Sequence, residues 1–306
     1  MSGIFWHIVT FTAAGIFLIL LVYRVIAIVR LPVHLRWELA PIPHEKGKGT
    51  YGGSYLEEYE WWHQPRHRSL VAPIIYMLRE IFLLKSIWKN NPGLWPLSFS
   101  LHTGIFILII TLFLQILNAI FIIGKVDESV LNVTLTIANI LAPIGFILGC
   151  LGAVGLILKR TLDADYRSFT TVTRYFHLVF LCAVFISGIY ARFVPGDFAL
   201  ETSSFIKSLG TLDAGISVTS PLAAHIIIFL LFLIYLPLTD MAHFIAKYFT
   251  YHHVRWNDAP QDERMTGELR RLLTLPVGWS GPHVLVREPK SWMDTTTGNK
   301  KNGEKT

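Results

Sequence analysis

Five uninterrupted apolar runs, each long enough to cross a lipid bilayer, constrain the fold of this chain more than any other feature. A helix needs roughly 20 residues, at about 1.5 Å each, to span the hydrocarbon core. Inside a bilayer, backbone N–H and C=O groups must be paired within a helix or a closed barrel. No strand-like alternation is present, so the sequence predicts an all-α integral membrane bundle of five transmembrane helices. The runs are Ile4–Val29, Leu97–Ile123, Val130–Leu158, Tyr175–Val194 and Ser220–Ile245.

Composition supports a membrane protein, because only 16% of the 306 residues are charged and 52% are hydrophobic. A soluble protein carries about 25% charged residues. No basic residue precedes the first run and no small-residue cleavage site follows it. The first run is therefore expected to be a retained helix rather than a signal peptide.

Lysine and arginine are distributed unevenly between the loops. Nine lie in residues 30–96, four in 159–174 and ten from residue 246 onward, whereas the opposite loops hold only Lys125, Arg192 and Lys207. Cytoplasmic loops carry the positive excess, which predicts an N-terminus outside, a C-terminus in the cytoplasm and a multi-pass protein of a prokaryotic cytoplasmic membrane. The net charge of +6 is then a topology signal, and no nucleic-acid partner is expected because no aromatic-interleaved basic patch is present.

The chain divides into four predicted segments. Residues 1–30 form the first transmembrane helix, 31–96 a cytoplasmic segment, 97–246 a four-helix membrane core, and 247–306 a cytoplasmic tail. Within the second segment, residues 73–89 are amphipathic, which predicts a helix in the membrane interface that ends at Asn90-Asn-Pro-Gly93. The polar tail has no hydrophobic repeat able to build a domain, and we expect it to contact a partner subunit.

Cysteine usage limits the redox chemistry of this chain. Its two cysteines, Cys150 and Cys182, both lie in apolar runs. Two thiols exclude an iron–sulfur cluster held by this chain alone and a covalent c-type haem. His63 and His67 have i, i+4 spacing, but no carboxylate or cysteine completes a metal site around them, and Pro65 interrupts the helix. Any iron–sulfur centre is expected in another subunit.

Five of the twelve histidines lie within the apolar runs. A titratable side chain in a membrane helix is costly and indicates function by default. Imidazole in apolar surroundings suits b-type haem, which takes two axial nitrogens from facing helices. For each histidine, the alternative is a packing or proton-relay role. The five are His7, His102, His177, His225 and His243.

The spacing of these histidines along the helices, and their depth in the membrane, predict which of them lie close together. His225 and His243 are 18 residues apart in the fifth run. Eighteen residues make five helical turns, so both rings would share one face about 27 Å apart. His102 lies near the start of the antiparallel second run, at the depth of His243. His102 and His243 are therefore the predicted axial pair of a cytoplasmic-side haem b.

A second haem at His225 lacks an evident partner. The position ten residues beyond His102 is Leu112, which cannot ligate iron, so His7 at the outer end of the first run is the predicted substitute. The haem count stays open at two or one. His177, near the cytoplasmic end of the fourth run, is a candidate for contact with a haem propionate or a quinone, or for replacing a ligand of the inner haem.

The second run opens Leu101-His102-Thr103-Gly104. With five helices, an outside N-terminus and the 18-residue histidine interval, the chain resembles the respiratory nitrate reductase gamma-subunit family of membrane cytochromes b. Within it, the chain is most similar to cytochrome b subunits of sulfite-reductase-associated or tetrahaem-cytochrome-associated membrane complexes of sulfate reducers. The resemblance covers roughly residues 75–250. It implies two stacked b haems, with His102, His225 and His243 at ligand positions and Leu112 at the fourth, and a quinone site near the outer haem.

The resemblance also implies a function. The chain would be the quinone-reactive electron-transfer subunit of an anaerobic respiratory oxidoreductase complex. It would exchange electrons between menaquinone or menaquinol and a cytoplasmic iron–sulfur subunit similar to heterodisulfide reductase, with a periplasmic multihaem cytochrome c as a further partner. Lys125 and Arg192 are candidates for a quinone carbonyl or haem propionate, the alternative being interfacial snorkelling. The alternative function is a non-redox transporter or anchor subunit whose intramembrane histidines serve proton transfer or packing.

Overall fold

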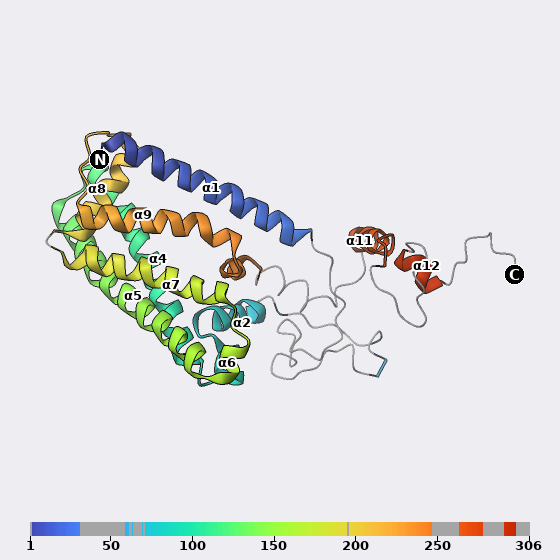
Figure 1. Ribbon diagram of the computed structural model, residues 1–306. Coiled ribbons are helices and arrows are strands. Elements are labelled where there is room, and N and C mark those ends of the chain that lie inside the picture. Colours follow the sequence, from blue (N-terminus) through green and yellow to red (C-terminus); the bar gives the residue numbers. More distant parts are fainter. Residues whose placement is uncertain are drawn as a thin grey trace, which may run out of the picture. The chain divides into compact units, whose positions relative to one another are not determined.

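The computed structural model describes residues 2–30, 59–60, 63, 69, 71–194, 196–246, 263–277 and 291–297. The chain forms two compact units, one of residues 1–26 and 68–245 and one of residues 27–67 and 246–306. Five helices are long and apolar enough to cross a membrane (Figure 1), and the described residues form no β-strand. The predicted all-α membrane bundle is confirmed. The five are α1 (Gly3–Val29), α4 (Trp95–Gly124), α5 (Glu128–Leu162), α7 (Val172–Phe193) and α9 (Ser220–Tyr235).

The helices of the first unit pack in a series. α5 packs against α4 on one side and α7 on the other, and α7 packs against α9. α1 lies beside α9 (Figure 1), and its buried residues are all in its first half: Gly3, Trp6, His7 and Ala13. We call the end with the N-terminus and α8 (Phe198–Thr211) the outer end. The other end, with α6 (Ala164–Ser168) and residues 236–246, is the basic end.

α4 and α5 approach closely because glycines line their contact. A Cβ on Gly104 would lie 2.4 Å from the backbone nitrogen of Gly149 and 2.7 Å from the carbonyl oxygen of Gly145. A Cβ on Gly152 would lie 2.4 Å from the backbone nitrogen of Leu101. These distances are far shorter than atoms allow, so only glycine permits this approach. The contact fixes the register of the part of α4 that carries His102.

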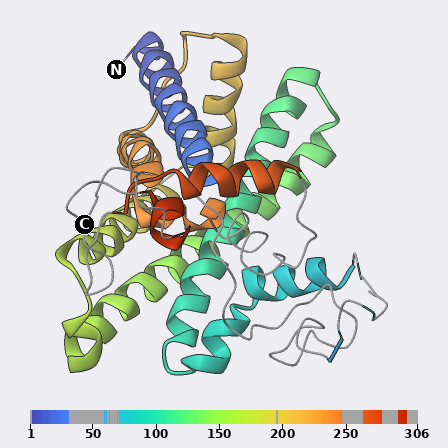
Figure 2. The same cartoon turned by 90° about the vertical axis from the view of Figure 1, so that its right-hand side faces the viewer.

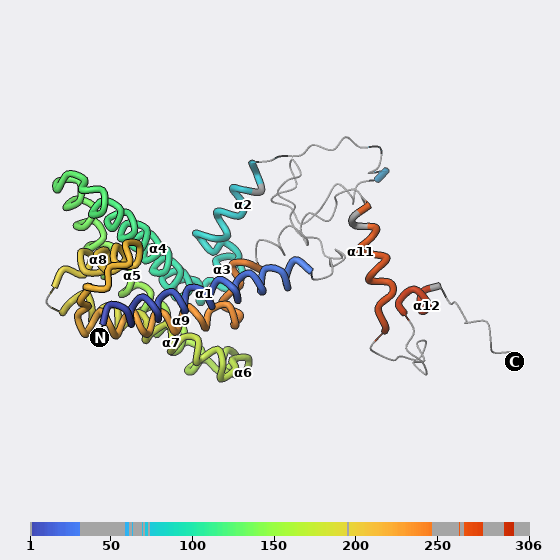
Figure 3. The backbone as a smooth tube through the Cα atoms, turned by 90° about the horizontal axis from the view of Figure 1, so that it is seen from above, coloured from blue at the N-terminus to red at the C-terminus, as the bar shows by residue number. Residues whose placement is uncertain are grey.

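Two short helices precede α4, where the sequence predicted one interfacial helix over 73–89. α2 (Val71–Phe82) and α3 (Lys85–Asn90) are separated at Leu84, whose φ is +49°. That left-handed conformation cannot continue an α-helix, so the single-helix prediction is wrong, although the predicted stop at Asn90 is confirmed. α2 runs crosswise to α4 (Figures 2 and 3), with the ring of Phe82 5.2 Å from that of Phe106.

The fifth apolar run is not one continuous helix, and that prediction is wrong too. α9 ends at Tyr235, Leu236–Leu238 and Asp240–Ala242 form 3₁₀ turns, and Thr239 between them is extended (φ −118°, ψ 172°). Pro237 lacks the N–H that an α-helix needs at that position. The five-turn argument that placed His225 and His243 on one face therefore does not hold.

α8 was not predicted from the sequence, and a network around Asn139 of α5 holds its start. Asn139 Nδ2 donates to Asp197 Oδ1 (2.7 Å), and Asn139 Oδ1 accepts from the backbone N–H of Ala199 (3.2 Å). Asp197 caps α8 by accepting from the N–H of Leu200 (3.0 Å), and Arg192 Nε donates to the carbonyl of Asn139 (3.1 Å). α8 is thereby fastened to the outer ends of α5 and α7.

We expect Asn139→Ala to loosen the first turn of α8. The variant removes both side-chain bonds of Asn139 but not the carbonyl that Arg192 uses, and loss of such end contacts costs roughly 1–2 kcal/mol. Amide hydrogen exchange over residues 198–203 should become faster. The control is Asn132→Ala, because Asn132 is exposed on the same helix. Equal exchange in the two variants would contradict this role of Asn139.

Among its described residues, the second unit has the helices α11 (Glu263–Leu273) and α12 (Trp292–Thr297) and a bridge between Pro276 and Ser291. The predicted contact of the tail with a partner subunit stays a prediction. Residues 31–58 and 247–262, which carry much of the predicted cytoplasmic segment and tail, lie outside the described residues.

Candidate functional site

The structure brings His102 and His243 together at the basic end. Their ring centres are 6.2 Å apart and their planes are inclined by 65°. Two imidazoles bound to opposite sides of one metal ion, each through a metal–nitrogen bond of about 2 Å, have ring centres roughly 6 Å apart. The separation of the two rings therefore fits a pair of axial ligands.

Both rings are oriented by their own backbone. His102 Nδ1 lies 2.7 Å from the carbonyl oxygen of Ser98, and His243 Nδ1 lies 3.2 Å from that of Asp240. A carbonyl oxygen only accepts, so each Nδ1 carries the hydrogen, and in a neutral imidazole the lone pair is then on Nε2. Metal-bound histidines are typically held in this way by their second nitrogen. The tautomer of both side chains is thus the one that a ligand through Nε2 requires.

The break after α9 determines where His243 lies. Thr239 Oγ1 accepts from the backbone N–H of Met241 (3.2 Å) and caps the second 3₁₀ turn. His243 follows that turn directly, and its partner His102 lies on the second turn of α4. The proximity predicted from matched depth is therefore found, but a kinked segment rather than a straight helix brings His243 to His102, and ligation of a haem by this pair stays a prediction.

His177 is the third histidine at the basic end, and it is 7% exposed. Its Nδ1 lies 3.0 Å from Asp240 Oδ1, and the Nε of Arg174 lies 3.8 Å from Asp240 Oδ2. His177 Nε2 is buried and has no hydrogen-bond partner among the described residues. Asp240 thus orients His243 with its carbonyl and His177 with its carboxylate. Asp240 was missed in the sequence, although it is the one carboxylate within the fifth apolar run.

His225 lies in the outer half of α9, in aromatic surroundings. Its Nδ1 is 3.0 Å from Ser187 Oγ, and Ser187 donates its own hydrogen to the carbonyl of Val184 (2.9 Å). His225 Nδ1 is therefore the donor in this contact, and Nε2 keeps the lone pair. The rings of Phe146, Phe198 and Phe229 lie 5.3, 6.4 and 6.4 Å from the ring of His225.

The proposed partner of His225 is not in ring contact with it. His7 is buried, and its ring centre lies 6.3 Å from that of Phe11. His7 Nε2 has no hydrogen-bond partner among the described residues. Leu112, at the fourth position implied by the resemblance, is 41% exposed. A His7–His225 ligand pair therefore stays a prediction.

Lys125 and Arg192 lie at the outer end, as expected. Lys125 ends α4 in a left-handed conformation (φ 51°), and Arg192 donates to the carbonyl of Asn139. Arg192 also lies over the ring of Phe193, 5.8 Å from its centre. The contacts of Arg192 are those of a residue that fastens helix ends, and a quinone contact for either residue stays a prediction.

A row of buried polar side chains on α4 was also missed in the sequence. Thr111, Gln115 and Asn118 are at most 4% exposed, and Asn118 Oδ1 accepts from Thr134 Oγ1. Gln115 Nε2 and Asn118 Nδ2 are buried without a partner in the described part of the chain. In the sequence, the signal that could have identified this row is the presence of these two amide side chains in a mostly apolar run.

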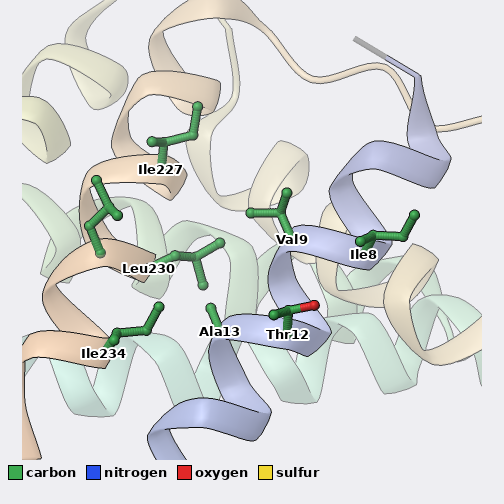
Figure 4. Close-up of a pocket in the computed structure, with 8 residues that line it drawn as sticks. Ile8, Val9, Thr12, Ala13, Ile227, Leu230 and Ile234 are labelled. Atoms are coloured by element: carbon green, nitrogen blue, oxygen red, sulfur yellow. The ribbon is translucent and has the colours of Figure 1, made fainter.

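An apolar groove of about 290 Å³ runs between α1 and α9. Figure 4 shows Ile227, Leu230 and Ile234 of α9 facing Val9 and Ala13 of α1 across it. No histidine lines the groove. Its lining suits hydrocarbon chains and offers no group for redox or proton chemistry.

Comparisons with known protein families, curated proteins and solved structures give no match for this chain. Within the described ranges, no three histidine, cysteine, aspartate or glutamate side chains gather as a metal-ion site. The candidate chemistry therefore depends on the histidine pair and on the His177–Asp240 contact.

Proposed function

We propose that this chain is a haem b subunit of a membrane respiratory complex and exchanges electrons with quinone. The observation that carries the proposal is the pair His102 and His243, with ring centres 6.2 Å apart and both Nδ1 atoms held by backbone carbonyls. A bound haem b would supply one-electron redox chemistry. His102 and His243 would hold the haem through Nε2, and the carbonyls of Ser98 and Asp240 fix the tautomer of the two rings.

One haem at His102 and His243 is the central part of the proposal. His225 is the candidate ligand of a second haem, because Ser187 holds its Nδ1 in the same donor state. His7 is the candidate for the opposite ligand. A second haem would extend the path of electrons toward the outer end.

The partners follow from the resemblance and the charge distribution. We propose menaquinone or menaquinol as the membrane partner and a cytoplasmic iron–sulfur subunit similar to heterodisulfide reductase as the soluble one. A periplasmic multihaem cytochrome c is a further candidate partner. The proposed location is a prokaryotic cytoplasmic membrane, supported by the five membrane-spanning helices and the basic loops on one side.

Mixing the oxidised, purified protein with a naphthoquinol, a menaquinol analogue, tests the quinone link. We expect the absorption bands of reduced haem b to appear on mixing, because electrons pass from the quinol to the haem. Dithionite reduction of the same sample gives the full amplitude. Haem that dithionite reduces and the naphthoquinol leaves oxidised would contradict electron exchange with quinone.

A proton-transfer protein is the second candidate, and the contact between buried His177 and exposed Asp240 favours it. Titratable groups inside membrane helices often serve as proton relays. This alternative requires no haem. A correctly assembled sample that contains none would therefore select it over the redox proposal.

A further inference from the structure

His177 is the most unusual polar group of the basic end that the proposed haem site does not use. More than nine-tenths of it is buried, and Nε2 has no partner among the described residues. Nδ1 faces the carboxylate of Asp240 at 3.0 Å. Because a carboxylate only accepts, Nδ1 carries the hydrogen, and in the neutral imidazole Nε2 then presents a lone pair inside the bundle. A buried acceptor of this kind is costly unless a donor reaches it.

Aromatic side chains of α7 and α9 adjoin this nitrogen. The ring of Tyr235 lies 5.6 Å from the ring of His177, and the rings of Phe176 and Phe180 each lie 5.5 Å from Tyr235. Phe176 is 51% exposed on α7, one of the helices long and apolar enough to cross a membrane. Aromatic rings favour flat, apolar rings by stacking or edge contacts. A flat ligand that comes from the membrane and carries hydroxyl groups matches this combination.

Asp240 links His177, whose ring lies beside Tyr235, to His243 and to the solvent. Its carbonyl holds His243, its carboxylate holds His177, and its side chain is 61% exposed and lies near Arg174. A proton that reached Nε2 could leave through Nδ1 and Asp240 to water. An electron released at the same place would lie beside the histidine pair. The proton and the electron released by a ligand at His177 would therefore leave this site by different routes.

We propose that a quinone headgroup binds at the basic end against Tyr235 and Phe176, with one of its oxygens hydrogen-bonded to His177 Nε2. This inference rests on the proposed function, and it places the quinone at the opposite end from the one that the resemblance implies. When a hydroquinone is oxidised by one electron, its O–H bond breaks. The proton goes to His177 Nε2, and the electron goes to the one-electron acceptor proposed at His102 and His243.

The first test measures binding and does not require haem. The full-length protein is irradiated with an azido-naphthoquinone, and the labelled peptides are identified by mass spectrometry. We expect label on residues 172–180 or 232–243, and less label when unmodified naphthoquinone competes. Label confined to α1, α8 or the outer half of α4 would overturn the proposal, whether or not the protein contains haem.

The second test compares His177→Gln with Gln115→Leu, because Gln115 is the matched control: a buried polar side chain in the outer half of α4 whose Nε2 also lacks a described partner and to which no haem or quinone contact is assigned. We expect both variants to keep the haem that dithionite reduces. In His177→Gln, reduction of that haem by the naphthoquinol should slow by roughly a hundredfold, the usual effect of losing a positioned proton acceptor. Gln115→Leu should match the unmodified protein.

Each other outcome of the second test is informative. An unchanged rate in His177→Gln, or slowing in Gln115→Leu alone, would overturn a quinone site at the basic end. Loss of haem in His177→Gln would also overturn it, because His177 would then act as an iron ligand. Absence of haem from the unmodified protein would contradict the proposed function instead, and photolabelling would then decide the quinone site alone.

Discussion

Replacement of His243 by alanine should remove the haem at the basic end and leave the chain assembled in the membrane. His243 is exposed and begins a helical turn directly after the 3₁₀ turn Asp240–Ala242. Its truncation therefore costs little packing, whereas a bis-histidine haem loses one of its two axial nitrogens. Haem per chain should fall by one, as measured by the pyridine haemochrome spectrum of the monodisperse protein.

Two further variants distinguish ligand loss from general damage. His102→Ala should have the same effect, because His102 supplies the opposite nitrogen in the proposal. His243→Met should retain haem and raise its midpoint potential, since a thioether ligand stabilises the reduced iron. Full haem content in both alanine variants would contradict the assignment of this pair as axial ligands.

Replacement of Gly104 by valine should prevent α4 from packing against α5. Its Cβ would lie 2.4 Å from the backbone nitrogen of Gly149 and 2.7 Å from the carbonyl oxygen of Gly145. Backbone atoms of a packed helix cannot rotate away as a flexible side chain can, so the two helices must separate. Overpacking typically costs about 1–3 kcal/mol or more, and a clash with backbone on both sides belongs at the upper end.

The matched control is Gly15→Val, a mid-helix glycine of α1 with nothing within 4 Å of an added Cβ. We expect Gly15→Val to be purified in normal yield with its haem. Gly104→Val should give little monodisperse protein, and what remains should lack haem because α4 carries His102. Size-exclusion chromatography and thermal unfolding measure both effects. Similar behaviour of the two variants would contradict the account of the α4–α5 contact.

The spanning helices could be predicted because the bilayer sets their length. The second run was expected at Leu97–Ile123 and forms α4 at Trp95–Gly124, and the fourth was expected at Tyr175–Val194 and forms α7 at Val172–Phe193. The differences are of one turn or less, at ends where caps and interfacial residues extend a helix beyond its apolar part. Hydrophobicity alone does not record those caps.

Features that depend on tertiary contacts could not be predicted in this way. α8 is too short to span the membrane, and its sequence begins Phe-Ala-Leu-Glu-Thr-Ser-Ser, so hydropathy gives no signal for it. Its position depends on hydrogen bonds from Asn139, 60 residues earlier than Ala199. The break at Pro237 was visible in the sequence, but the apolar residues around it favoured a continuous helix.

The candidate site could be predicted only in part, because some of its contacts follow from depth in the membrane and others depend on the tertiary fold. Matched depth on antiparallel helices was enough to pair His102 with His243, because depth follows from counting residues along each span. The contact of His177 with Asp240 depends on the direction that the 3₁₀ turns give to one side chain. Residue counting cannot supply that direction, so the role of Asp240 emerged only from the fold.

The most direct test of the central proposal is a reduced-minus-oxidised optical spectrum of the purified, monodisperse protein, with pyridine haemochrome quantitation per chain. The account predicts haem b bands and at least one haem per chain, held by His102 and His243. Two per chain would assign His225 to the second haem and direct the search for its opposite ligand to His7. A correctly assembled protein without haem would contradict the redox proposal and favour a transporter or anchor subunit that uses its buried histidines for proton transfer or packing.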